Sequence, residues 1–251
     1  MSNRLDIKEE SIVYNQESLA YVLGVLCGDG CLSKLKCSNH RRFELQTTDR
    51  EFANALSNKF FLAFGEKPRW NELDRSGLTA SKHKYNSHYY RIICHKQKIT
   101  KFLSQFKSHT KDWRVPLFIK DGNNSIKSSF IRGMFDSEGD VTLSKKEGKY
   151  YYPRTRFSNT NEVGTLELKQ LMKSIGVDSY ISREHRMIDK YEVNVVRIII
   201  SGLKRNKSFF NLIGFSIKKK QEKLRRYLCE KDISFGVDVG YGNTSCVKLG
   251  S

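Results

Sequence analysis

The sequence has no run of about eighteen apolar residues, the length that a membrane-spanning helix needs, and no CxxC pair among its six cysteines. Its first residues, MSNRLDIKEESIVYNQ, are too polar for a secretory signal peptide. Several cysteines lie in apolar runs, where a reduced thiol packs as a small hydrophobe. These absences argue against a membrane protein or a disulfide-stabilised secreted protein. They predict a reducing compartment inside a cell: the cytoplasm, the nucleoid or an organelle matrix.

Acidic residues are scarce relative to basic ones. The 251 residues include 45 Lys and Arg against 27 Asp and Glu, which gives a net charge of +18. Such an excess predicts a polyanionic partner, although an AT-rich genome also inflates lysine content. The basic residues alternate along strand-like runs and do not form one amphipathic helix, which argues against a membrane surface as the partner.

One apolar stretch occurs twice, as LAYVLGVLCGDG at 19–30 and FIRGMFDSEG at 130–139. Each copy has helical spacing, two small residues four positions apart, and an acidic residue followed by glycine at its end. The small pairs are Gly24 with Gly28 and Gly133 with Ser137. The acidic residues, Asp29 and Glu138, lie 109 positions apart.

Small residues at i and i+4 share one helix face and allow two helix backbones to come close together. If the two helices pack through these faces, Asp29 and Glu138 meet at their ends. Two adjacent carboxylates either share a proton or bind a divalent cation. The negative ends of the helix dipoles also favour a cation there. The repeat therefore predicts a metal site that both halves of the chain build.

The two segments resemble the paired motifs of the LAGLIDADG homing endonucleases, in the monomeric form that carries both motifs on one chain. The matching positions are Gly24 and Gly133, Gly28 and Ser137, Asp29 and Glu138, and Gly30 and Gly139. The first copy departs from the consensus at the sixth position, where Cys27 replaces an aspartate that the second copy keeps as Asp136. In the family that residue is not the essential metal ligand.

Periodicity predicts a mixed α+β fold in which an αββαββα unit is duplicated about a pseudo-twofold axis, and the resemblance implies the same fold. Each half should carry one antiparallel sheet, with the motif helices packed between the halves. The expected strands are 31–36, 42–47, 67–73 and 87–94 in the first half, and 140–145, 151–158, 178–183 and 191–201 in the second. The expected helices after the motifs are 49–65, 97–106, 161–175, 203–212 and 218–228.

The predicted domains are an N-terminal half at 1–109, a linker at 110–126, a C-terminal half at 127–233 and a flexible or loosely docked tail at 234–251. Polar runs such as KDGNNS mark the linker. No splicing-domain pattern is evident at either end, which favours a free-standing protein over an intein.

Basic and polar side chains alternate along the expected strands, so one face of each sheet can meet DNA while the other packs on helices. Two-stranded ribbons fit the major groove, where such side chains read base edges. The residues predicted to contact DNA are Lys34, Lys36, Arg42, Glu44, Gln46, Arg69 and Arg91 in the first half and Lys145, Arg154, Arg156, Ser158, Arg183 and Arg197 in the second. Because the halves differ, the target should be long and asymmetric.

Asp29 and Glu138 are the predicted metal ligands, most readily for Mg²⁺, with Mn²⁺ or Ca²⁺ able to replace it for binding. The resemblance implies that the carbonyls of Gly28 and Ser137 complete the coordination. It also implies, in each half, a polar residue at the end of the second strand and a lysine after the third helix. These roles are assigned to Thr47 and Asn159, and to Lys111 and Lys218, with Arg114 as an alternative to Lys111.

Two other metal sites are weaker hypotheses. Cys31, Cys37 and His40 do not have the spacing of a zinc finger. Residues 136–147 place oxygen ligands as in an EF-hand loop, but Val141 stands where the turn requires glycine.

The resemblance implies a monomeric endonuclease that cuts double-stranded DNA and leaves short 3′ overhangs. Two alternatives remain open from sequence: an intron-splicing maturase that binds RNA on the same fold, and a DNA-binding regulator that does not cut. The acids in both motifs favour cleavage over the regulator.

Overall fold

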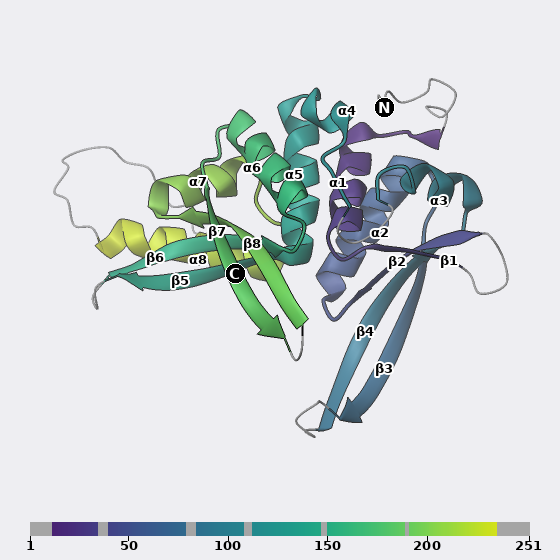
Figure 1. Ribbon diagram of the computed structural model, residues 1–251, viewed down its shortest axis with the longest axis horizontal. Coiled ribbons are helices and arrows are strands. Elements are labelled where there is room, and N and C mark those ends of the chain that lie inside the picture. Colours follow the sequence, from purple (N-terminus) through teal and green to yellow (C-terminus); the bar gives the residue numbers. More distant parts are fainter. Residues whose placement is uncertain are drawn as a thin grey trace, which may run out of the picture.

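A computed structural model describes residues 12–34, 40–78, 84–107, 112–146, 150–188 and 191–234. Two α+β halves lie side by side, and their first long helices, α1 and α5, pack against each other at the centre (Figure 1). A four-stranded sheet projects from each half on the same side of this helix pair (Figure 1). None of the described helices is long and apolar enough to cross a membrane.

The first half contains α1 (Gln16–Cys27), β1 (Cys31–Lys34), β2 (Arg41–Thr47), α2 (Arg50–Phe64), β3 (Arg69–Leu78), β4 (Lys84–Cys94) and α3 (Gln97–Leu103). Its strands are antiparallel in the order β1-β2-β4-β3. Local chemistry explains the bounds of α2. The Asp49 side chain accepts a hydrogen bond from the Phe52 amide at 3.0 Å, and Gly65 ends the helix at a φ of 69°.

The second half contains α4 (Leu117–Lys120), α5 (Asn124–Glu138), β5 (Gly139–Lys146), β6 (Tyr150–Asn159), α6 (Glu162–Ser174), β7 (Tyr180–Ile188), β8 (Tyr191–Ser201), α7 (Leu203–Leu212) and α8 (Lys218–Ser234). Its antiparallel sheet has the order β5-β6-β8-β7, which matches the first half strand for strand. The predicted duplication and fold class are confirmed. The tail after Ser234 lies outside the described residues.

The α1–α5 contact depends on the predicted small residues. A Cβ atom on Gly24 would lie 2.2 Å from the Phe130 carbonyl oxygen, and one on Gly133 would lie 2.4 Å from that of Tyr21. The backbones therefore touch, and no larger residue fits without moving a helix. The expected packing through the small faces is confirmed.

The segment predicted as a linker packs closely on the second half. Trp113 is fully buried, and its carbonyl accepts a hydrogen bond from Asn161 Nδ2 at 2.7 Å. A Cβ atom on Gly164 would lie 2.7 Å from the Trp113 ring, so glycine makes room for the indole. The segment also forms α4, and α5 begins at Asn124, three residues before the predicted start of the C-terminal half at 127.

Each sheet has two distinct faces. On the helix face of the first sheet Phe43, Leu45 and Ile92 are buried in the core. The opposite face, called here the open face, carries Arg42, Glu44, Gln46, Arg69 and Arg91 in the first half and Arg154, Arg156, Ser158 and Arg197 in the second. This alternation follows from the two-residue period of a strand.

Candidate active site

The motif acids lie at the adjoining ends of α1 and α5. A Cβ atom on Gly28 would be 2.5 Å from the Ser137 Cβ and 3.6 Å from the Glu138 Cγ, so these helix ends are in contact. Desolvation, then the charge of Asp29, raises the pKa of Glu138 to about 7. Desolvation also raises the pKa of Asp29, while the ammonium groups of Lys220 and Lys107 oppose that rise. The two carboxyl groups therefore form one electrostatic unit.

Lys107 binds the end of the first motif. It is buried, and its Nζ donates to the carbonyl oxygens of Leu26 at 2.6 Å, Gly30 at 3.1 Å, Gly28 at 3.2 Å and Cys27 at 3.3 Å. An ammonium has three protons, so four acceptors share them. Burial lowers the pKa of Lys107, and nearby negative groups, including both motif acids, raise it.

Lys220 occupies the corresponding position in the second half. Its Nζ donates to the carbonyl oxygens of Asp136 at 2.7 Å and Phe135 at 3.3 Å, near the end of α5. Burial lowers the pKa of Lys220, while Asp136 and Asp29 favour its charged form. The centre thus combines two carboxylates with two ammonium groups.

The sequence assignment named Lys111 and Lys218 for this role, whereas the structure places Lys107 and Lys220 at the helix ends. Lys218 is exposed at the start of α8, and Lys111 lies outside the described residues. In a helix the position of Lys220 follows Ile217 by three residues and precedes Leu224 by four, which places it on the buried face with them. That apolar spacing could have selected Lys220 among the three consecutive lysines.

The polar residues assigned to the ends of the second strands do not lie on the open faces. Thr47 and Asn159 lie on the helix faces, paired with Tyr90 and Val196. Thr47 Oγ1 accepts from the Asp49 amide at 3.1 Å, and Asn159 Oδ1 accepts from the Asn161 amide at 2.9 Å. Both side chains thus help to begin the next helix.

Their neighbours Gln46 and Ser158 occupy the open faces, where the sequence prediction had placed them as DNA contacts. Because successive strand residues point to opposite faces, a shift of one position reverses the face.

The sixth motif position differs between the copies in role as well as in residue. Asp136 is buried, accepts from Tyr21 Oη at 2.8 Å, and accepts from the Ser216 amide at 3.1 Å. It therefore joins α1 of the first half to the segment before α8. Cys27 is buried in the apolar core, where desolvation raises its thiol pKa to about 12. It does not supply a reactive thiolate.

The donors at the helix ends fit a hard divalent cation. The groups present are the carboxylates of Asp29 and Glu138 and the backbone carbonyls beside them, and oxygen ligands are those that Mg²⁺ prefers. Among the described residues, no group of three or more His, Cys, Asp or Glu side chains is placed to hold a metal. Further ligands of an ion here would have to be water or substrate phosphate.

Of the two alternative metal sites, the EF-hand loop is not formed. Asp136 and Glu138 belong to α5 and Val141 to β5, so no EF-hand loop exists there. Cys37 of the zinc hypothesis lies outside the described residues, while Cys31 and three other described cysteines are free thiols.

The open faces include most of the predicted DNA contacts but not all of them. Strand register puts Lys34, Lys145 and Arg183 at positions that belong to the opposite faces, and their contact with DNA stays a prediction. Arg183 instead donates to Glu162 at the start of α6, with Nε to Oε1 at 2.9 Å. Lys36 lies outside the described residues.

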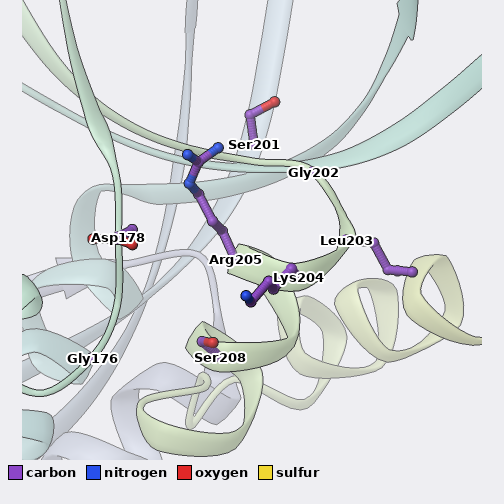
Figure 2. Close-up of a pocket in the computed structure, with 8 residues that line it drawn as sticks. All are labelled: Gly176, Asp178, Ser201, Gly202, Leu203, Lys204, Arg205 and Ser208. Carbon is purple, nitrogen blue, oxygen red and sulfur yellow. The ribbon is translucent and has the colours of Figure 1, made fainter.

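The motif acids do not line either of two cavities found elsewhere. One, of about 430 Å³, lies between the start of α7 and the segment before β7. Lys204, Arg205 and Ser208 line it from α7, and Ser201 lines it from the end of β8 (Figure 2). The other, of about 460 Å³, includes Tyr14, Phe64 and Lys96 in the first half. The candidate site is therefore distinct from the cavities.

Comparison with known proteins agrees with this architecture. The family model of the LAGLIDADG-like domain matches residues 125–214. The uncharacterized protein MJ0314 of Methanocaldococcus jannaschii is 32% identical over 176 residues, which cover 64% of this chain and 59% of that protein. MJ0398 of the same organism is 25% identical over 224 residues, 85% of this chain and 72% of that protein. The chain thus spans little more than half the length of MJ0314.

Among solved structures, the fold is similar to that of the homing endonuclease I-WcaI bound to its DNA recognition sequence. The TM-score is 0.55 and the sequence identity 11%, with 88% of this chain and 94% of that chain covered. At this identity the match concerns the fold.

Proposed function

Because the chain belongs to the LAGLIDADG family, we propose that it is a site-specific endonuclease that hydrolyses phosphodiester bonds in double-stranded DNA with a divalent metal ion. One observation carries the proposal. Asp29 and Glu138, 109 residues apart in sequence, meet at the ends of α1 and α5 with Lys107 and Lys220 beside them. A protein that only binds DNA has no need for two coupled carboxylates at its centre.

The substrate class follows from charge and shape. The net charge of +18 and the arginine-bearing open faces of both sheets suit a polyanion. The two sheets project on one side of the helix pair, so a duplex along them passes the ends of α1 and α5 (Figure 1). The halves present different side chains, which calls for a long, asymmetric target read by one monomer.

Asp29, Glu138 and the carbonyls of Gly28 and Ser137 would hold Mg²⁺, and Mn²⁺ or Ca²⁺ would support binding. The ion, when bound, supplies Lewis acidity and lowers the pKa of a water molecule. Lys107 and Lys220 keep the two helix ends in place and add positive charge where a scissile phosphate would lie. Gln46 and Ser158 are the polar side chains on the open faces that can orient water there.

The proposal includes a double-strand break with short 3′ overhangs, in which each half serves one strand. The first test is cleavage of a host-genomic or randomised DNA library with Mg²⁺, followed by sequencing of the ends. Discrete cuts at one long site, lost in Asp29→Asn and Glu138→Gln, are expected. Glu222→Gln, which neutralises an exposed carboxylate on α8, is the matched control and should cut as the wild type does.

The same library separates the alternatives. Selective DNA binding without cuts under all metal conditions would point to a regulator. Retention of structured intron RNA, with neither selective DNA binding nor cleavage, would point to a maturase.

A further inference from the structure

The open face of the first sheet contains a carboxylate where a DNA-binding surface would be expected to avoid one. Glu44 lies in the middle of β2, between Cys31 on β1 and Ile93 on β4. Its relative exposure is only 8%. A carboxylate in this position repels phosphate groups and loses hydration, so it must serve the surface in another way.

Three side chains from two strands contact Glu44: Arg91 and Gln46 donate hydrogen bonds to it, and Arg42 forms an ion pair with it while its Nε–H donates to Ser33 Oγ at 3.0 Å. Arg91 makes a two-pronged contact, with Nε to Oε1 at 2.7 Å and Nη2 to Oε2 at 2.9 Å. Arg42 Nε lies 3.0 Å from Oε2, and Gln46 Nε2 donates to Oε1. The hydrogen bond from Arg91 is the main cause of a lowered Glu44 pKa, so this carboxylate is charged at neutral pH.

The second half reaches the same arrangement with different residues. The position of Glu44 is taken by Arg156, which donates to Asp140 on β5, with Nε to Oδ1 at 3.0 Å. On the same open face, Glu184 on β7 is paired with Arg197 on β8 and with Arg186 on β7. The carboxylate lies on β2 in the first half and on β5 and β7 in the second, so the acids occupy different strands, yet arginines on both open faces are held by carboxylates.

This pairing changes what the arginines can do. An arginine without a carboxylate partner can reorient to contact any nearby phosphate, which strengthens binding to every DNA sequence alike. An arginine fixed by a carboxylate keeps one orientation, and its remaining N–H groups can meet only a base edge presented in the matching place. The carboxylate also offsets part of the attraction to the backbone.

We propose that Glu44 is a specificity-determining positioning residue: it fixes Arg91, Arg42 and Gln46 on the DNA-facing surface and limits binding to unrelated DNA. This inference rests on the proposed function, because it requires that the open face meets a duplex.

The test compares Glu44→Gln with Asp74→Asn. Both remove one negative charge from the same sheet, but Asp74 lies on the opposite face of β3, where it contacts His88 Nδ1 at 2.7 Å. Dissociation constants are measured for the selected target and for an unrelated duplex over a range of salt concentrations. For Glu44→Gln we expect about tenfold tighter binding to unrelated DNA at low salt and at least tenfold weaker discrimination. The logarithmic salt slope should steepen by about one for each arginine that gains a phosphate.

Asp74→Asn should leave the slope and the discrimination unchanged. A second variant covers the case in which Glu44→Gln folds poorly: Glu44→Gln/Arg91→Gln removes one freed cation and should return the salt slope toward the wild-type value. Equal effects of Glu44→Gln and Asp74→Asn, or no change with either, would overturn the inference while wild-type cleavage left the proposed function standing. Failure of the wild type to bind a duplex selectively would instead remove the proposed function.

Discussion

In both halves a lysine ammonium group donates to carbonyl oxygens at the end of the motif helix, but the two lysines come from different places in the chain. In the first half a lysine four residues after the end of α3 contacts four carbonyl oxygens, whereas in the second a lysine within α8 contacts two. The second half adds a buried aspartate, Asp136, where the first has Cys27. Duplication has thus preserved the charges at the helix ends more strictly than the residues that supply them.

The largest loss of stability should come from variants at the contact between α1 and α5. Gly24→Ala and Gly133→Ala each place a Cβ atom within 2.4 Å of a backbone carbonyl oxygen of the partner helix. Overpacking of this kind costs about 3 kcal/mol in the free energy of unfolding, although alanine normally stabilises a helix over glycine. Denaturant melts of both variants, with exposed Asn54→Ala on α2 as control, measure the loss. Equal or greater stability of either variant would contradict the α1–α5 packing.

Replacement of Lys107 should lower the free energy of unfolding more than replacement of Lys220. Lys107→Met leaves four backbone carbonyls without their donor, and Lys220→Met leaves two. Loss of charged hydrogen bonds in buried sites costs roughly 1.5–3 kcal/mol, so Lys107→Met should lie near the upper value and Lys220→Met near the lower. Exposed Lys218→Met serves as the control. Cleavage should fall in both buried variants, and cleavage lost only in Lys218→Met would restore the sequence assignment.

The pKa of Glu138 gives a pH signature for the metal-free protein. Its folded-state pKa of about 7 exceeds the ordinary 4.5, so the folded state binds more protons between these values and loses stability as pH rises through them. The full shift would correspond to about 3 kcal/mol, which solvent screening at this half-buried group reduces to about 1–2 kcal/mol. Glu138→Gln should flatten the decline between pH 4.5 and 7. An unchanged slope in melts with a chelator would contradict the raised pKa of Glu138.

The smallest difference in unfolding free energy is expected between variants of Thr47 and Asn159, whose side chains accept hydrogen bonds at the starts of α2 and α6. Asn159 accepts from the Asn161 amide and from Trp113 Nε1 at 3.4 Å, whereas Thr47 accepts only from the Asp49 amide among the hydrogen bonds found in the described residues. Asn159→Ala should therefore cost about 1 kcal/mol and Thr47→Ala about 0.5 kcal/mol in unfolding free energy. Gln46→Ala is the contrasting variant, since it should slow cleavage without this loss. Slower cleavage in Thr47→Ala with unchanged stability would reverse the assignment.

The comparison also shows where sequence reasoning succeeds. The paired small residues and the terminal acids predicted the helix contact and the meeting of Asp29 and Glu138, because helical spacing and sterics determine both. The order of helices and strands along each half followed from duplication, and the polar open faces followed from alternation. These features depend on patterns that extend over many residues.

Assignments that depend on a single register were less secure. Thr47 was chosen in place of Gln46, and Lys218 in place of Lys220. From sequence alone, neighbouring polar residues cannot be told apart until a buried residue nearby shows which of them faces the core. The contact of Arg183 with its partner Glu162 could not be predicted from the sequence. The docking of Trp113 on the second half needed Gly164, a contact between distant residues that no local pattern reveals.

The central claim, that Asp29 and Glu138 form one metal centre, is tested most directly by Mn²⁺ binding. Electron paramagnetic resonance of the protein with its selected duplex would give the affinity for the wild type, Asp29→Asn and Glu138→Gln. If the acids share the centre, each single variant should bind Mn²⁺ at least tenfold more weakly. Wild-type affinity in both variants would contradict a metal centre at the ends of α1 and α5.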